Sequence, residues 1–478
     1  MKSIRNIIIL SLGLFCLSSC ESMLDVEVKS EISGSTYWQS EADFEPYLYG
    51  IYGRFRSHWD NMSFAEDRGD MWVPGYNNRF SSYWIQDISA GQTSTWTGYY
   101  GTIGHCNLLL SHIDSFSFTN ENLKRQIKAE ALTLRAAVYF YIAKIWGDVP
   151  LLLEPVVDEK EPLHPRTDVA DIFKQINQDI QEALSLYPEE GYNDKYRFSK
   201  PSTYALLADV KLWEATVLNG GDICLNDVID AVTEVENSGV RLLDNYGDIF
   251  DKKKNDEIIF SIYLERSEYT SGSYNNALLR IDTSGSADNV SELPIALAGQ
   301  QAYCLSDRAL EIIKKYESDG DKRISRTCIP ELSNGEVLHW WANKFRGTKY
   351  SDDRVADSDM IVYRLSEMYL FKAEAYALMG DIPNALKYLN LVRDRAGIPE
   401  YNNTDRQSLL MEILDERGRE LFHEIKRFWD LRRADASGTI DIYNYIPNLK
   451  GKNTPLYWAV HVNMMSLNDQ LVQTEGYE

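Results

Sequence analysis

The sequence has 478 residues, of which 44% are hydrophobic, and its formal net charge at pH 7 is −23. This length allows two or three domains, and the hydrophobic content is sufficient for a large buried core. Because phosphate backbones are bound by basic surfaces, the acidic balance argues against nucleic acid as a partner.

A lipoprotein signal peptide is predicted over residues 1–19. Lys2 and Arg5 precede a short apolar run that has the length of a secretory signal core and is too short to span a membrane. The run ends in "LSSC" (17–20), which resembles the lipobox of bacterial lipoproteins, where cleavage precedes an acylated cysteine. We therefore expect Cys20 to be the lipidated first residue of the mature chain. The alternative is an ordinary secretory signal with a cysteine near the cut by chance.

The rest of the chain predicts a mostly helical fold with long irregular loops and a few short strands. Arg135 lies on an apolar helix face and is expected to be buried and paired. Residues 60–95 and 240–355 are rich in Gly, Ser, Asn, Asp and aromatics, and 258–264 is a strand candidate. Binding residues concentrate in such loops when a rigid scaffold carries them. Helical spacing of apolar residues marks the segments 96–113, 121–145, 168–187, 202–218, 226–238, 306–316, 361–379, 382–396 and 406–434.

One helix pair carries a repeat signature. In "AEAYALMGDIPNALKYL" (373–389), small and large residues have the spacing of a tetratricopeptide hairpin, with Gly380-Asp381 at the turn. The stretch 202–213 begins a similar hairpin with a weaker match. These features predict tetratricopeptide-like hairpins that form a superhelical scaffold.

A run of arginines and carboxylates at 412–433 is the most tempting place for catalysis. Glu416 and Glu420 lie four residues apart on one helix face, as a pair of glycosidase carboxylates would. Interleaved arginines favour ion pairing instead, which lowers a carboxylate pKa, whereas a general acid needs a raised pKa. The pairs expected are Asp415 with Arg419 and Glu424 with Arg427. Since no hydrolase, zinc-protease or P-loop motif occurs either, we expect no catalytic residue.

The mature chain keeps four cysteines, Cys106, Cys224, Cys304 and Cys328. They form no C-x-x-C pair, and no histidine has the spacing of a zinc site. We expect buried thiols, no metal and no cofactor, while a bridge between Cys304 and Cys328 stays open. The segment "SDGDK" (318–322) offers oxygen ligands for calcium but lacks EF-hand spacing, which favours a solvated turn.

Three loop segments, 66–84, 269–276 and 339–345, combine aromatic with planar polar side chains. Sugar rings have apolar C–H faces that stack on Trp and Tyr, and their hydroxyls need fixed donors and acceptors. The alternative is that these rings close small cores beneath the loops. The residues expected to contact a ligand are Asp70, Trp72, Tyr76, Asn77, Arg79, Trp84, Tyr274 and Trp341.

Four stretches, together with the lipobox, resemble the SusD/RagB family of outer-membrane nutrient-binding lipoproteins. They lie at 129–155, 363–380, 389–397 and 416–433 and follow the family's order. Ile425 stands where the family often has glycine. The resemblance implies a helical body with four tetratricopeptide-like units, displayed on a Bacteroidetes-type cell. It divides the mature chain into an N-terminal SusD-like helical region (20–240), a loop-rich insertion region (241–355) and a C-terminal SusD/RagB helical region (356–478).

The resemblance also implies a function. Such a protein is a non-enzymatic receptor that captures oligosaccharide or polysaccharide and delivers it to a SusC-like TonB-dependent transporter. Its partners would be the glycan and the transporter, with membrane contact through the lipid anchor only. A peptide-binding RagB-like receptor, an extracellular glycan-degrading lipoprotein and a pure interaction scaffold are the alternatives.

Overall fold

The computed structural model describes residues 37–76, 81–156, 162–192, 194–281, 285, 287–297 and 303–477. Cys20, Asn77 and Arg79 therefore lie outside the described residues. The helices are α3 (Phe44–Trp59), α4 (Met62–Ala65), α5 (Thr97–Ser115), α6 (Glu121–Trp146), α7 (Val169–Leu186), α8 (Lys200–Thr216), α9 (Gly221–Asn237), α10 (Asp248–Asp251), α11 (Gly272–Asn276), α13 (Asp307–Ile313), α14 (Ile324–Thr327), α15 (Leu365–Met379), α16 (Ile382–Ala396), α17 (Arg406–Glu420), α18 (Arg427–Ala436), α19 (Ile442–Tyr445) and α20 (Val462–Leu467), with short 3-10 turns η2 (Glu41–Asp43) and η3 (Glu317–Asp319).

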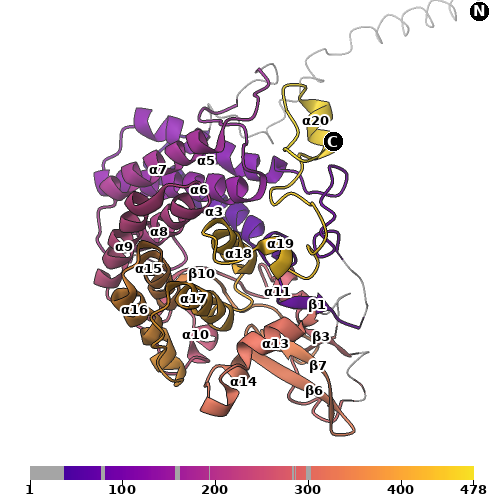
Figure 1. Ribbon diagram of the computed structural model, residues 1–478. Coiled ribbons are helices and arrows are strands. Elements are labelled where there is room, and N and C mark those ends of the chain that lie inside the picture. Colours follow the sequence, from indigo (N-terminus) through magenta and orange to yellow (C-terminus); the bar gives the residue numbers. More distant parts are fainter. Residues whose placement is uncertain are drawn as a thin grey trace, which may run out of the picture.

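The strands are few and short, as predicted. They are β1 (Trp72–Pro74), β2 (Ile258–Ile262), β3 (Leu279–Arg280), β4 (Ile295–Ala296), β5 (Tyr303–Leu305), β6 (Cys328–Ser333), β7 (Glu336–Ala342), β8 (Thr348–Lys349), β9 (Arg354–Val355) and β10 (Met360–Arg364). Figure 1 shows the long helices α5 to α9 and α15 to α17 gathered in one body, with β1, β3, β6 and β7 at one end beside α13 and α14. The mostly helical fold class is confirmed.

Helix α6 forms the centre of the helical body. Every residue from Ala129 to Trp146 is buried, because α5, α7 and α8 pack around this helix. Arg135 is buried and paired, as expected: its guanidinium donates to both oxygens of Asp179 at 2.7 and 2.8 Å and to Asn107 at 2.9 Å. A buried charge is tolerated when such a bidentate partner compensates it.

The predicted tetratricopeptide hairpin is α15 and α16. Gly380 ends α15 in the left-handed conformation (φ 83°), and the side chain of Asp381 caps α16 by accepting from the Asn384 N–H. The α8–α9 and α6–α7 pairs pack in the same way, as neighbours in sequence and in space. A local turn of this kind defines the α15–α16 hairpin, whereas α6 and α7 are joined by the longer segment 147–168.

The helices differ from the sequence prediction in several places. Helix α3 was not predicted, because Gly50 and Gly53 weaken its helical propensity, yet five buried side chains at spacings of three and four hold it against the core. The helix predicted from residue 361 starts as strand β10 and becomes α15 only at Leu365. The single helix predicted over 406–434 is two helices, α17 and α18.

A four-stranded antiparallel sheet of order β1-β5-β7-β6 joins distant parts of the chain. Trp72 of β1 pairs with Leu305 of β5, and Cys304 of β5 pairs with Trp341 of β7. The loop-rich region therefore shares a sheet with the N-terminal region. The boundaries predicted between the regions, at 240 and 355, stay predictions. A separate pair, β2 and β10, confirms the strand candidate at 258–264.

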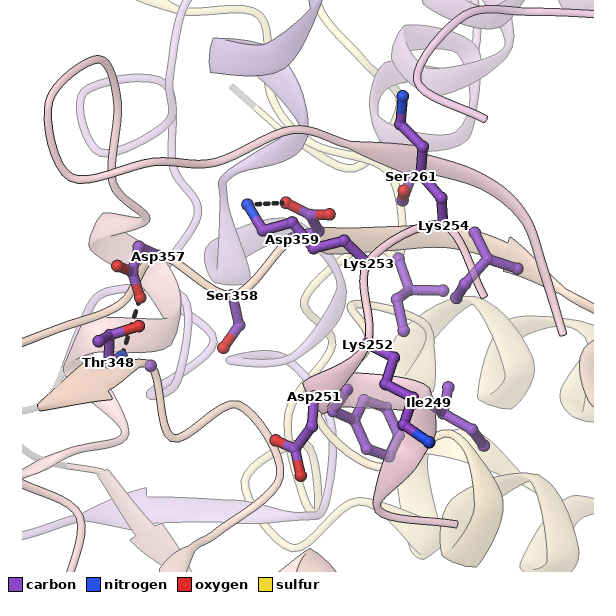
Figure 2. Close-up of a pocket in the computed structure, with 14 residues that line it drawn as sticks. Ile249, Asp251, Lys252, Lys253, Lys254, Ser261, Thr348, Asp357, Ser358 and Asp359 are labelled. Atoms are coloured by element: carbon purple, nitrogen blue, oxygen red, sulfur yellow. Dashed lines mark hydrogen bonds and ion pairs between the residues drawn. The ribbon is translucent and has the colours of Figure 1, made fainter. Parts of the chain in front are cut away.

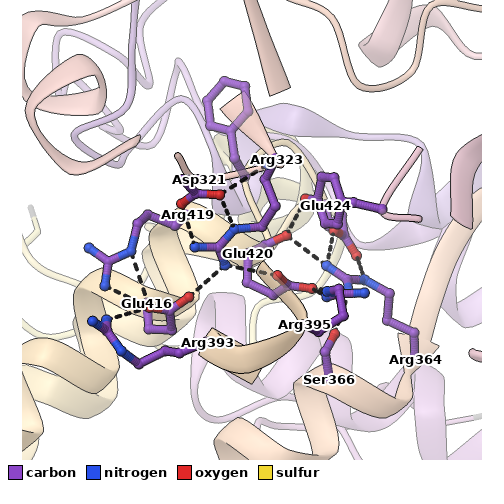
Figure 3. A network of polar contacts seen from close by, with 12 residues as sticks. Asp321, Arg323, Arg364, Ser366, Arg393, Arg395, Glu416, Arg419, Glu420 and Glu424 are labelled. Atoms are coloured by element: carbon purple, nitrogen blue, oxygen red, sulfur yellow. Dashed lines mark hydrogen bonds and ion pairs between the residues drawn. The ribbon is translucent and has the colours of Figure 1, made fainter. Parts of the chain in front are cut away.

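A buried network of ion pairs connects α17 to the helices and strands around it (Figure 3). Glu420 binds Arg323, Arg364 and Arg395. Glu416 binds Arg323, Arg393 and Arg419 at 2.5, 3.1 and 2.7 Å, and Glu424 binds Arg364 and Lys344 at 2.8 and 2.6 Å. Salt bridging is confirmed for this run, but apart from Glu416–Arg419 these partners lie far away in sequence. Neither predicted pair, Asp415 with Arg419 or Glu424 with Arg427, is among the ion pairs of the described residues. Asp415 faces Arg308 and Lys315, and Arg427 binds Asp70.

The network keeps its carboxylates ionised. Burial alone would raise the pKa of Glu416, but the charges of Arg323, Arg419 and Arg393 lower it to about 2. The pKa of Glu420 is likewise lowered far below its ordinary value, against the effect of burial, by Arg395, Arg364 and Arg323. Neither group can hold a proton near neutral pH, so neither has the property of a general acid.

We predict that Glu416→Gln lowers the free energy of unfolding by about 3 kcal/mol at pH 7. A carboxyl pKa lowered from 4.5 to about 2 on folding corresponds to about that much stabilisation of the folded protein. The stabilisation is present above pH 4.5 and is lost as the pH falls toward 2, so parent and variant should converge in acid. Urea unfolding at several pH values measures both effects. The exposed Glu311→Gln is the control and should change stability by less than about 0.5 kcal/mol. Equal stabilities of parent and Glu416→Gln at pH 7 would contradict this prediction.

Candidate functional site

Aromatic and apolar side chains are exposed near the ends of β1 and β7. Tyr76, just after β1, is 38% exposed, and its ring centroid lies 4.7 Å from that of His339 with the planes at 89°. Val337 and Leu338, on β7, are each about half exposed. We call Tyr76, Val337, Leu338 and His339 the β1–β7 edge. It offers an aromatic surface of the kind that a sugar ring or an apolar side chain can cover.

The Tyr76 ring is held from beneath. Its face tilts toward Trp341 at a centroid distance of 6.0 Å, and the Trp341 indole N–H donates to Glu331 Oε2 at 3.0 Å. Partial burial, with the charge and hydrogen bond of Glu331, raises the pKa of Tyr76 to about 12. The phenol is therefore neutral at physiological pH. Because these contacts restrict the ring before any ligand arrives, little conformational entropy is lost on stacking.

Four of the residues expected to contact a ligand are buried instead, so the sequence prediction is corrected for each of them. Asp70 forms two bonds with Arg427, at 2.7 and 2.9 Å. Trp72 stacks on Phe422 with centroids 4.9 Å apart, and Tyr274 stacks on Phe345 at 4.4 Å. Trp341 has no exposed surface. Trp72 and Trp341 belong to two small buried clusters and Tyr274 to the main core, because burying aromatic area stabilises the fold.

Of the other predicted residues, Tyr76 and Trp84 are partly exposed, and the Trp84 indole N–H donates to the Trp72 carbonyl at 2.9 Å. Asn77 and Arg79 lie outside the described residues. These four stay predictions for ligand contact. The sequence reading missed Val337 and Leu338. The signal that would have found them is the β6–β7 hairpin, whose turn contains Asn334-Gly335 with both φ values positive.

The segment that leads into β1 is anchored deep in the protein. Glu66 accepts from the Trp72 indole and from the Lys426 N–H, and Arg68 donates to Gln86 and to the Leu456 carbonyl. On the far side of Tyr76, Ser81 donates to Asp67 at 3.0 Å. Both ends of the stretch that carries Tyr76 are thus tied to the core.

The cysteines and the candidate calcium turn were both singled out in the sequence, and the structure places them. No group of His, Cys, Asp and Glu among them could hold a metal ion. Cys304 and Cys328 are free thiols, which answers the question of a bridge, and burial raises the pKa of Cys328 to about 12. The "SDGDK" turn was predicted to be solvated. Its residue Asp321 is instead buried and paired with Arg323.

Known proteins similar to this chain share both its sequence pattern and its fold. The model of the SusD family matches residues 309–477, and the model described as "Starch-binding associating with outer membrane" matches residues 24–212. A "SusD-like protein P25" of Formosa agariphila is 27% identical, over 99% of this chain and 98% of its own length. The chain belongs to the SusD/RagB family.

Solved structures agree with this SusD/RagB assignment. NanU of B. fragilis has a TM-score of 0.80 at 24% identity and covers 95% of this chain and 100% of its own. A "Laminarin binding SusD-like protein" has a TM-score of 0.76 at 22% identity. The match covers 92% of this chain and 100% of that protein's chain. At these identities the two likenesses show the fold. Within the part of this SusD/RagB chain that the structure describes, no helix is long and apolar enough to cross a membrane.

We predict a pH-dependent effect of Asp67→Asn. Burial raises the pKa of Asp67 to about 6 in the folded protein, from an ordinary 3.8, so its ionisation costs stability as the pH rises between these values. The amide does not ionise. The stability of the variant relative to the parent should therefore increase by about 2 kcal/mol between pH 4 and pH 7.

Chemical denaturation at several pH values measures this difference. Asp469→Asn, at an exposed position, is the matched control and should change stability by less than about 0.5 kcal/mol throughout. A pH-independent difference between Asp67→Asn and the parent would show that Asp67 is ionised at no cost in the folded state.

Proposed function

We propose that this SusD/RagB protein is a cell-surface lipoprotein that binds an oligosaccharide or polysaccharide at the β1–β7 edge and delivers it to a SusC-like TonB-dependent transporter. The observation that carries the binding proposal is the Tyr76 ring, which is partly exposed, neutral and held in place beside His339. The matched model for starch-binding proteins and the laminarin-binding structural neighbour support a glycan as the ligand class.

The edge suits a neutral glycan for physical reasons. A pyranose ring has an apolar face that stacks on an aromatic ring, and its hydroxyls bond with neighbouring polar groups. Tyr76 offers the ring, and His339 offers polar nitrogens beside it. Affinity at one such site is modest, but a membrane anchor keeps the protein at high effective concentration beside a transporter in the same membrane.

The anchor in this proposal is the acylated Cys20. Each buried methylene of an acyl chain contributes about 0.8 kcal/mol to membrane binding, and two or more chains hold a protein firmly. The transporter partnership follows from the family resemblance.

A peptide receptor is less well supported by the sheet. Peptides commonly bind by adding a strand to an open sheet edge. Here the outer strand β6 is already engaged, since the Leu332 carbonyl accepts from Asp288 N–H and the Pro330 carbonyl accepts from the Asn289 side chain. The other outer strand, β1, has its Trp72 carbonyl occupied by Trp84.

We predict that Tyr76→Ala weakens glycan binding at least about tenfold, because removal of an aromatic anchor from a binding surface costs about 2 kcal/mol or more. A glycan array that includes laminarin and starch oligosaccharides selects the ligand, and calorimetry with that ligand measures the dissociation constant. Tyr49→Ala is the matched control, because Tyr49 is 50% exposed on α3 and is not part of the edge.

Two results would overturn the proposal: no glycan on the array binds, or Tyr49→Ala and Tyr76→Ala weaken binding equally. Product analysis on the calorimetry sample tests the enzymatic alternative. New reducing ends that require the folded protein would identify a glycan-degrading enzyme instead of a receptor.

We predict that Cys20→Ser moves the protein from the membrane fraction to the soluble fraction of cells, because serine cannot form the thioether on which the lipid is carried. Fractionation followed by immunoblotting measures the distribution. Retention of the variant in the membrane fraction would mean that another feature holds the protein there.

A further inference from the structure

A polar cavity of about 140 Å³ lies between α10, strand β2 and the chain that runs from β8 to β10 (Figure 2). None of its lining residues belongs to the β1–β7 edge. We propose that this cavity is a second carbohydrate subsite that binds one neutral sugar ring. This proposal rests on the proposed glycan-binding function and extends it to a separate location.

Each lysine that lines the cavity has a carboxylate partner. Lys252 pairs with Asp248 at 2.7 Å, and Lys254 pairs with Asp194 at 2.8 Å. Lys253 pairs with Asp359 at 3.1 Å, and Figure 2 shows this pair at one side of the cavity. Because each lysine has its own carboxylate, an anionic ligand gains no uncompensated cation. These pairs, together with Asp357, which accepts only from neutral donors, disfavour an anionic ligand.

The carboxylates that line the cavity retain acceptor capacity. Asp357 is buried and accepts from two neutral donors, the Thr348 N–H at 2.8 Å and the Tyr350 hydroxyl at 2.6 Å. Its side chain lies across Ser358 from the Lys253–Asp359 pair (Figure 2). An ionised carboxylate has about four lone-pair positions, so it can accept further hydrogen bonds from hydroxyl groups. Sugar hydroxyls both donate and accept, which matches a wall of alternating carboxylates, ammonium groups and hydroxyls.

A buried hydroxyl without a protein partner points to a missing ligand. Ser261 on β2 lines the cavity and is only 1% exposed, yet no described residue forms a hydrogen bond with its Oγ. Buried polar atoms are nearly always hydrogen-bonded, and an unpaired one costs free energy. A hydroxyl of a bound sugar would satisfy this atom.

The remaining wall is apolar and the space is of the right size for one ring. Ile249, Ile258 and Ile361 line the cavity and can contact the C–H face of a sugar. An engineered protein cavity of about 150 Å³ accommodates benzene, a six-membered ring. The cavity is therefore suited to a single ring, such as the end of a glycan chain or one unit of it.

The test is an NMR titration of the mature protein labelled with ¹³C at its isoleucine δ1-methyl groups. The neutral ligands are methyl glucopyranosides and methyl galactopyranosides. Sodium glucuronate and sodium phosphate are the anionic comparisons. A neutral glycoside should cause saturable shifts in the methyl signals of Ile249, Ile258 and Ile361. Ser261→Ala should weaken that binding about threefold to tenfold, the effect of one lost hydrogen bond, and should not lower the melting temperature of the unliganded protein, because the removed hydroxyl is unpaired there. Asp357→Asn, which replaces an acceptor with a donor at nearly constant shape, should also weaken binding.

The outcomes separate this proposal from the binding proposal for the edge. Tyr76→Ala should leave the cavity shifts unchanged, so a loss of edge binding and a loss of cavity binding are distinguishable. Absence of saturable shifts with every neutral glycoside, or shifts with glucuronate or phosphate only, would overturn the second subsite. Unchanged glycoside affinity in both Ser261→Ala and Asp357→Asn would overturn it as well.

Discussion

Charge compensation around Glu420 connects the main parts of this structure. Three arginines meet this carboxylate in the interior, from the loop before α14, from the end of β10 and from α16. Removing charged groups from water costs free energy. A buried group of charges is therefore stable only when nearly every charge has a partner of opposite sign. The network therefore requires α16, α17, β10 and the segment before α14 to assemble together.

The same requirement explains the break between α17 and α18. His423 and Ile425 adopt positive φ values of 63° and 61°, which non-glycine residues rarely do and which cost energy in a β-branched residue. This local conformation turns Glu424 inward to Arg364 and Lys344. The ion pairs and the burial of Ile425 compensate for the strain at a position where the family often has glycine.

A rigid interior of this kind has a functional consequence. The edge that carries Tyr76 is exposed, but its supports are Glu331, the ion pair of Asp70 with Arg427, and the buried rings of Trp72 and Trp341. The charged and aromatic residues of the loop thus divide into two groups, one that fixes the loop and one that faces outward. The polar cavity beside β2 is built differently, from paired charges and hydroxyls, and suits the hydroxyl side of a sugar more than its apolar face.

The sequence by itself determined the helical scaffold, the hairpin at Gly380-Asp381 and the family, because these depend on local spacing, turn chemistry and short motifs. It also predicted that the arginine-rich run forms salt bridges, since interleaved opposite charges lower carboxylate pKa values wherever the partners lie. The tertiary structure alone decided which partners those are, because Arg323, Arg364 and Arg393 reach Glu416, Glu420 and Glu424 only through folding. It likewise decided that Asp70, Trp72, Tyr274 and Trp341 are buried while Tyr76 is exposed. Loop sequences of similar composition do not reveal which side of a ring or carboxylate faces the core, since that depends on contacts made by segments hundreds of residues away.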